Sequence, residues 1–254
     1  MIEVVDHEPG SGRVREIRLA RPPANAFNPP LVEALDTALA AAESEAQAIV
    51  VSGLPGMFSA GLDVPELLRL ERDALSRFWQ SFTRLLKRIA QTPLPVVFAM
   101  TGHAPAGGIV LAVFGDYRIM PRGDFKTGLN EVQVGLVVPP PVHLALVRLI
   151  GAHRAERILV AGEMMNAHRA LEIGLVDELA ADPEDVVRRA IDWCHQLLAL
   201  PQPAMLLTRS MARADLRRIF DNSSEFGVER FVEGWFCEST QATLRALVER
   251  LGKK

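Results

Sequence analysis

Cysteine is scarce in this sequence, with 2 residues among 254, Cys194 and Cys237. They lie far apart and form no CxxC pair, so neither a disulfide framework nor a cysteine-based zinc site is expected. Two isolated thiols suit a reducing compartment. The 6 histidines show no HxxxH or HxH spacing, and we therefore expect no metal site.

Charged residues make up only 23% of the chain, and the formal net charge is -3. A mildly acidic chain has no electrostatic reason to bind nucleic acid or an anionic membrane. Residues 1–6 lack the basic and apolar regions of a secretory signal, and they are acidic, unlike a mitochondrial transit peptide. Together with the Ala-, Arg- and Leu-rich composition, this favours a cytoplasmic, bacterial protein.

Three common ligand-binding and catalytic motifs are also absent. There is no GxGxxG and no GxxxxGK[ST], so a dinucleotide site and a P-loop lack support. Ser59 lies in the segment GMFSAG, which is not the GxSxG turn of an activated serine nucleophile. An acyl-enzyme hydrolase is therefore not expected.

The longest uncharged run, residues 94–115, contains no Asp, Glu, Lys or Arg. It is long enough to cross a bilayer. Pro95, Pro105 and the glycines at 102, 107 and 108 interrupt it, and His103 lies near its middle. The run therefore predicts a buried strand-turn-helix unit rather than a membrane span, with His103 packed or hydrogen-bonded.

Alternation of strand and helix patterns predicts an α/β fold with parallel strands, which becomes mainly helical after about residue 139. The expected strands are residues 13–19, 48–51, 96–100, 117–120 and 175–179. The expected helices are residues 29–39 with Asn28 as N-cap, 73–89, 107–114, 142–150, 154–160, 167–173 and 183–200.

Residues 201–203 (PQP) predict a hinge between a core of residues 1–200 and a helical region of residues 201–254. Helical patterns fill residues 204–251, with breaks near residues 221–224 and 238–239 and with Ser239 as an N-cap. Roughly fifty helical residues form too small a core to stand alone. This region should dock on the rest of the chain or on a partner subunit.

Two glycine turns could perform chemistry. Residues 58–63 (FSAGLD) follow a buried strand and precede an amphipathic helix, and residues 103–108 (HAPAGG) lie between a strand and a helix. Small residues let the backbone approach a ligand, and the free N–H groups of a first helical turn point outward. Two such groups aimed at one point would stabilise an oxyanion. Taken alone, each segment is more often an ordinary turn.

Several motifs together resemble the crotonase (enoyl-CoA hydratase/isomerase) superfamily in order and spacing. They are PANA at 23–26, FSAGLD at 58–63, PAGG at 105–108, DYRI at 116–119, GLNE at 128–131 and ALEIGLVD at 170–177. The resemblance implies a spiral of ββα units, with residues 201–254 driving trimers or dimers of trimers. It also implies an acyl-CoA thioester as substrate and no separate cofactor.

The resemblance also assigns site residues. The thioester oxygen would lie between the N–H groups of Leu62 and Gly107, and Glu131 would act on the acyl group. The remaining substrate-binding positions are Asn25, Ala26, Ala60, Gly61, Asp63, Gly108 and Asn130, with the adenine end of CoA near Asn25, Ala26 and Ala60. Asp63 could instead cap the helix that follows it. Asp116 and Arg118 are expected to be structural, as an ion pair at a strand edge.

The family's hydratases carry two glutamates, and this chain keeps only the second. Val110 stands at the first position and Glu131 at the second. Taken alone, Glu131 would be read as an exposed charge. In this context the chain looks most like the Δ3,Δ2-enoyl-CoA isomerases, which use a single glutamate as proton shuttle. The apolar neighbours Leu129, Val132, Val134 and Leu136 would raise its pKa. Hydratase, thioester hydrolase, decarboxylase and non-catalytic acyl-CoA binder remain alternatives.

Overall fold

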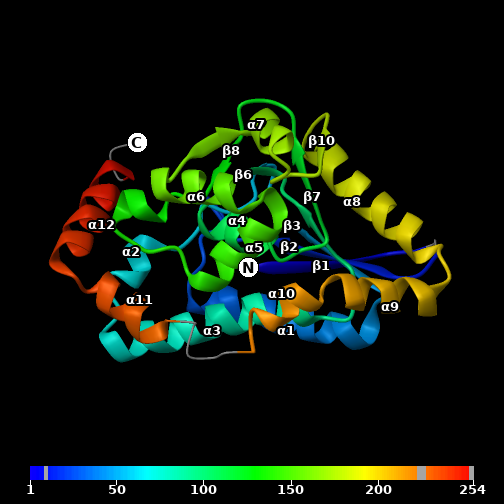
Figure 1. The fold of residues 1–254 in the computed structure, drawn as a ribbon, viewed down its shortest axis with the longest axis horizontal. Helices are drawn as coiled ribbons and strands as arrows, with labels where there is room; N and C mark the ends of the chain where they lie inside the picture. The colour runs from blue at the N-terminus through cyan, green and yellow to red at the C-terminus, as the bar shows by residue number, and fades with distance from the viewer. Residues whose placement is uncertain (9–10, 222–226, 252–254) are drawn as a thin grey trace.

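Two β-sheets occupy the centre of the computed structural model, and helices surround them (Figure 1). The model describes residues 1–8, 11–221 and 227–251. In the larger sheet the strand order is β1-β2-β3-β5-β7-β10, with β1 antiparallel to β2 and all other pairs parallel. Its strands are β1 (Ile2–His7), β2 (Val14–Leu19), β3 (Ala48–Ser52), β5 (Val96–Ala99), β7 (Tyr117–Pro121) and β10 (Glu178–Ala180).

Helices cover both faces of this sheet, because every central strand is apolar on both sides. Ile49 and Val51 of β3 belong to the main core cluster, which also holds the buried residues of α1 (Pro29–Glu45) and α3 (Arg72–Gln91). Val50 belongs to a second cluster, built with α8 (Pro183–Leu198) on the opposite face. Figure 1 shows α1 and α3 running alongside each other below the sheet and α8 on the other side.

The N-terminus of α1 confirms the predicted cap. The Asn28 side chain accepts a hydrogen bond of 3.0 Å from the N–H of Leu31, and proline occupies the first helical position. The helix continues to Glu45, six residues beyond the predicted end, because no Gly or Pro interrupts residues 40–45. The other predicted strands and helices of residues 1–200 are present, with ends that differ by a few residues.

A second, smaller sheet was not predicted. Its order is β4-β6-β8-β9, formed by β4 (Gly56–Met57), β6 (Gly102–Pro105), β8 (Lys126–Gly128) and β9 (Met164–Asn166). The first three strands are parallel, and β9 is antiparallel to β8. These strands have two to four residues each, which is too short for a period of two to stand out in a sequence.

The remaining helical segments complete the spiral. They are α2 (Val64–Leu67), α4 (Gly107–Ala112), the 3₁₀ helix η1 (Glu131–Val134), α5 (Pro140–Ile150), α6 (Ala152–Ala161), α7 (Ala167–Glu172), α9 (Gln202–Ala212), α10 (Ala214–Arg218), α11 (Val228–Trp235) and α12 (Glu238–Leu251). Residues 94–115 form β5, β6 and α4, as a buried unit. Within the described residues, no helix combines the length and apolarity that a membrane crossing requires.

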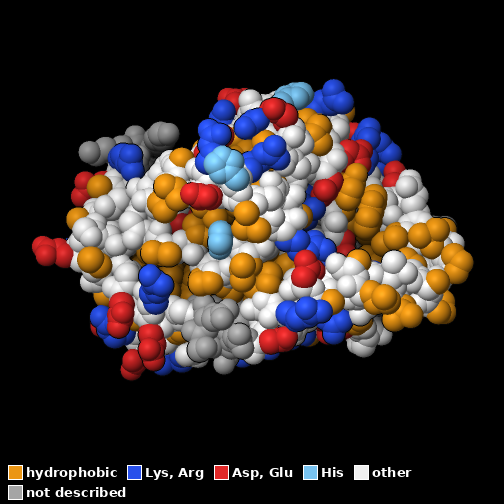
Figure 2. Space-filling model, viewed as in Figure 1, with side chains coloured by type: hydrophobic (Ala, Val, Ile, Leu, Met, Phe, Trp, Pro, Cys, Tyr) orange, Lys and Arg blue, Asp and Glu red, His pale blue; other side chains and the backbone are white. Residues whose placement is uncertain are grey.

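The C-terminal helices pack on the core. Leu216, Trp235 and Leu244 are buried in the same cluster as α3, and the ring of Phe231 stacks on Trp79 with 3.5 Å between centroids. Helix α8 ends at Leu198 and α9 begins after Pro201, at the place where a hinge was predicted. Exposed leucines and Met211 form an apolar surface on α9, at the right of Figure 2. The domain division and the oligomeric state stay predictions.

The predicted N-cap of the last helix differs from the structure. Ser239 lies inside α12, and the carbonyl of Cys237 accepts the first intrahelical bond, so the predicted Ser239 cap is wrong. Of the predicted break at residues 221–224, residues 222–224 lie outside the described residues.

Asp116 and Arg118 do not pair with each other. The Arg118 guanidinium pairs with the Asp177 carboxylate at 2.7 Å. The same carboxylate also accepts a hydrogen bond from the backbone N–H of Arg118. Asp116 instead pairs with Arg209 at 2.8 Å and with Arg213 at 3.2 Å. The predicted ion pair is therefore wrong, although both residues are structural.

Candidate active site

The small sheet brings the three predicted motifs to one edge. Strands β4, β6 and β8 are neighbouring and parallel, so their carboxyl ends lie on the same side. Residues 58–63 follow β4, residues 106–108 follow β6, and residues 129–131 follow β8. Loops at the carboxyl ends of parallel strands are the usual place for a ligand site in α/β proteins. The edge therefore forms a candidate active site.

The first two motifs touch through their backbones at Gly61 and Gly107. Gly61 has φ of +92°, a conformation that favours glycine. A Cβ atom added to Gly107 would lie 2.9 Å from the Cα of Gly61, closer than a side chain tolerates. Glycine at both positions therefore lets the two turns lie in direct contact.

Each turn presents an N–H group that the fold does not use. The N–H of Phe27 donates to the Gly61 carbonyl at 2.7 Å, and the N–H of Asp63 donates to the Phe27 carbonyl at 3.0 Å. This bridge directs the intervening N–H of Leu62 away from Phe27. Gly107 is the first residue of α4, whose first internal bond comes from the N–H of Val110. Among the described residues, neither Leu62 nor Gly107 has an acceptor for its N–H.

Ala106 connects these donors to the third motif. Its N–H donates to the carbonyl of Gly128 at the end of β8, at 2.8 Å. Its φ of +44° is unusual for a residue with a side chain and costs about 1–3 kcal/mol. The strain is held at the start of α4, where the free N–H of Gly107 points out of the helix.

Glu131 begins η1, three residues after β8. Its Oε2 atom is buried and has no hydrogen-bond partner among the described residues. Burial raises the pKa of this carboxyl group to about 7, against a smaller opposing effect of its own backbone N–H. Leu129 and Leu136 are buried as expected, whereas Val132 is 41% exposed and adds little to the apolar surroundings. The site thus contains one carboxyl group poised near neutrality.

The predicted polar substrate-binding side chains have structural partners. Asn25 is fully buried, accepts from the N–H of Arg21 at 2.8 Å and donates to the carbonyl of Phe58 at 3.0 Å. Asp63 caps α2 by accepting from the N–H of Glu66 at 3.0 Å, and it pairs with Arg21 at 2.7 Å. Capping, one of the two roles expected for Asp63, is confirmed.

The other predicted positions lie along the same edge. The Ala26 carbonyl accepts from Arg21 at 3.0 Å, and the Ala60 N–H donates to Ala24 at 2.9 Å. Gly108 is buried in the first turn of α4, and the Asn130 side chain forms no cap on η1. These backbone groups of Ala24, Ala26 and Ala60 are thus engaged in internal hydrogen bonds.

Val110 and His103 have no catalytic geometry. Val110, at the position of the family's first glutamate, is buried in the core. His103 accepts from the N–H of Lys126 at 3.0 Å through Nδ1, and its ring meets Phe125 edge-on, so the prediction of a packed, hydrogen-bonded residue is confirmed.

A model of the enoyl-CoA hydratase/isomerase family matches residues 10–253. The chain belongs to this family. It is 32% identical to human mitochondrial enoyl-CoA delta isomerase 1, over 98% of this chain and 83% of the relative. A probable enoyl-CoA hydratase of Mycobacterium avium is 32% identical over 80% of this chain and 77% of its own. The crystal structure of human mitochondrial Δ3-Δ2-enoyl-CoA isomerase superimposes with a TM-score of 0.90 at 30% identity, covering 98% of each chain.

The crotonase-type fold is thus confirmed. The structure also reveals two residues near the site helix that no motif indicated, Arg209 and Arg213 of the C-terminal region. Their contacts lie about a hundred positions away in sequence, so no local pattern could have found them.

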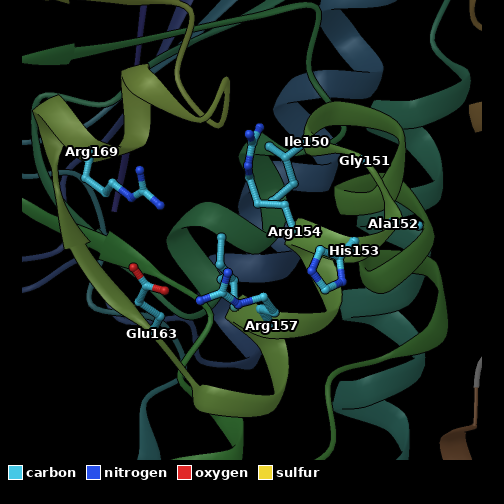
Figure 3. Close-up of a pocket in the computed structure, with 9 residues that line it drawn as sticks. Ile150, Gly151, Ala152, His153, Arg154, Arg157, Glu163 and Arg169 are labelled. Atoms are coloured by element: carbon cyan, nitrogen blue, oxygen red, sulfur yellow. The ribbon is translucent and has the colours of Figure 1, made fainter.

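A pocket of about 550 Å³ lies elsewhere, at the N-terminus of α6. Figure 3 shows Arg154 and Arg157 of α6, Arg169 of α7 and Glu163 around it. Its lining includes none of the strand-end residues, so this pocket is separate from the candidate active site.

Replacing Gly107 with Ala should force the two turns apart. We expect Gly107→Ala to lower the free energy of unfolding by about 1–3 kcal/mol in urea titrations, and to weaken acyl-CoA binding. Gly234→Ala is the matched control, because a Cβ there meets nothing within 4 Å and should stabilise helix α11 by about 0.5–1 kcal/mol. Equal stability and equal binding of Gly107→Ala and the native chain would contradict the close contact.

Burial of Glu131 should make stability depend on pH. Its folded pKa of about 7 lies above the ordinary value of 4.5, so the folded chain binds this proton more tightly than the unfolded chain. The native protein should therefore lose up to about 3 kcal/mol of stability relative to Glu131→Gln as pH rises from 4.5 to above 7. Urea titrations of both proteins at pH 5 and pH 8 measure this difference. A constant gap between them would show that the carboxyl is not buried.

Proposed function

We propose that this chain isomerises 3-enoyl-CoA to 2-enoyl-CoA, with Glu131 carrying the proton. The observation that supports this most is a carboxyl group with one buried oxygen free of partners, in the loop after β8, together with two free backbone N–H groups in the turns after β4 and β6. This combination suits a reaction that needs one base and one oxyanion stabiliser. Human mitochondrial enoyl-CoA delta isomerase 1 and the human Δ3-Δ2-enoyl-CoA isomerase of known structure are similar to this chain along nearly its whole length.

In the proposed reaction the thioester oxygen accepts hydrogen bonds from the N–H groups of Leu62 and Gly107. Glu131 removes a proton from C2, and the electron pair spreads through the double bond and the thioester to form a dienolate. Glu131 then returns the proton at C4, and the double bond moves to C2–C3. The two donors stabilise the charge on oxygen, a contribution that is typically about 3 kcal/mol for one such donor.

The raised pKa of Glu131 fits the shuttle role. A group that must both take and return a proton works best with a pKa close to the operating pH. Burial raises the pKa of Glu131 to about 7. An ordinary carboxylate would accept the C2 proton less readily, because the conjugate acid would be too strong.

Hydration is the second candidate, because relatives in the family carry hydratase names. Adding water requires one group to activate the water and another to deliver a proton to C2. Val110 offers no such group, and it is buried among apolar residues. The absence of a second carboxyl at this position favours isomerisation over hydration.

We further propose a homotrimer or a dimer of trimers, and we propose that CoA enters only as part of the substrate.

Glu131→Gln should abolish isomerisation. The amide keeps the shape of the side chain but cannot accept the C2 proton, so the rate should fall by about 100- to 10,000-fold. The assay follows the absorbance of the conjugated thioester formed from 3-enoyl-CoA, with acyl-CoA affinity measured by calorimetry. Glu156→Gln, on the exposed face of α6, is the matched control and should stay fully active. Activity of Glu131→Gln close to that of the control would rule out the proposed base.

The rate should rise with pH around neutrality. The carboxylate is the active form, so kcat/KM should increase as pH rises through about 7 and level off above it. A profile measured from pH 5 to pH 9 with 3-enoyl-CoA tests this. A midpoint near 4.5 would show an ordinary carboxyl group, and water addition to 2-enoyl-CoA at a comparable rate would favour the hydratase instead.

A further inference from the structure

The carboxyl end of helix α4 is closed by two buried arginines. Arg118 donates through Nη1 to the carbonyls of Ala112 at 3.3 Å and Gly115 at 3.2 Å. Arg213 donates to the carbonyl of Phe114 at 2.6 Å and to that of Gly115 at 3.1 Å. The two guanidinium groups thus donate to three carbonyls, of Ala112, Phe114 and Gly115, at the end of a helix where carbonyls normally bind water.

Water cannot replace these contacts, because the whole segment is buried. All residues of α4 are buried, and so are Val113, Phe114 and Gly115. Arg118 is 2% exposed and Arg213 is 5% exposed. Leaving a buried carbonyl without a donor destabilises the fold. These two side chains therefore supply donors that the end of α4 needs.

Three cations face two anions at this end of the helix. Arg118 pairs with Asp177, whereas Arg209 and Arg213 share Asp116. Burial lowers the pKa of Arg213 to about 10, so it keeps its charge at neutral pH. The cluster carries one net positive charge when both carboxyl groups are ionised. A cation at the carboxyl end of a helix adds to the positive potential at the amino end.

The opposite end of α4 carries the N–H of Gly107. A helix of this length spans only about 9 Å, and burial on all sides prevents it from bending independently of its ends. We propose that Arg213 is a positioning residue for the thioester site: with Arg118 it anchors α4 and directs the Gly107 N–H at the substrate oxygen. The C-terminal region thus supports the active site through Arg213, which does not contact the substrate.

This inference rests on the proposed function, because it assumes that Gly107 binds a thioester oxygen. It also predicts that the paired donors of the Arg213 guanidinium matter, and not only its positive charge. Arginine can donate to the carbonyls of Phe114 and Gly115 together, whereas lysine offers a point charge in their place. Arg213→Lys should therefore retain part of the effect and Arg213→Gln should lose it.

The test uses hexanoyl-CoA labelled with ¹³C at the thioester carbon, which cannot isomerise. Infrared difference spectra of the bound label report how strongly the site polarises the carbonyl. The native protein should lower the carbonyl frequency relative to free hexanoyl-CoA. Arg213→Gln should move the band back toward the free value and lower kcat by about tenfold with KM within about twofold. Arg213→Lys should lie between them.

Arg217→Gln is the matched control. Arg217 lies on the exposed side of α10, bonds Ser210 at 2.9 Å and has the same charge as Arg213, so its variant should match the native band and rate. A folded Arg213→Gln with the native band and kcat would overturn the inference. If Arg213→Gln does not fold, Arg213→Lys decides, and a native band in that variant would overturn it. An unshifted band in the native protein would instead contradict the proposed function.

Discussion

The direct contact between the backbones of Gly61 and Gly107 is the constraint on which the site depends. The two glycines lie in turns that follow different strands. A side chain at either position would collide with the backbone of the other turn. The contact places the unused N–H groups of Leu62 and Gly107 in adjacent turns. A single added methyl group would act on both donors at once.

The parallel arrangement of β4, β6 and β8 supplies the third component. All three strands end at the same edge, and Glu131 follows the end of β8 by only three residues. The strain at Ala106 and the buried, unpartnered oxygen of Glu131 both cost stability. Both lie at this edge of the small sheet, and violations of local folding rules are expected at functional sites.

The sequence predicted the large elements and the motif residues well, and the contacts between distant segments poorly. Helices α1 and α3 were predictable because their apolar residues recur over four or more turns, and Asn28 and Pro29 mark a start. The small sheet was missed because β4 has only two residues. The motifs nevertheless indicated the turns at residues 58–63 and 103–108, which accompany its strands, because the close contact of these turns requires glycine.

Burial and pairing were the least predictable features. Val132 was expected beside Glu131 but is exposed, since the 3₁₀ helix turns successive side chains to different sides. Asp116 and Arg118 were expected to pair because they are close in sequence, yet each found a partner about sixty or more positions away. Asp177 precedes β10, the neighbour of β7, and Arg209 lies on α9. Both pairings follow from tertiary packing, which no local pattern encodes.

The most direct test of the central claim is a crystal structure of the chain with a bound acyl-CoA. The account predicts the thioester oxygen at about 2.7–3.1 Å from the backbone nitrogens of both Leu62 and Gly107. It also predicts a carboxylate oxygen of Glu131 within reach of C2 and C4 on one face of the acyl chain. A thioester oxygen bound to neither nitrogen, or a Glu131 side chain turned out to solvent in the complex, would contradict it.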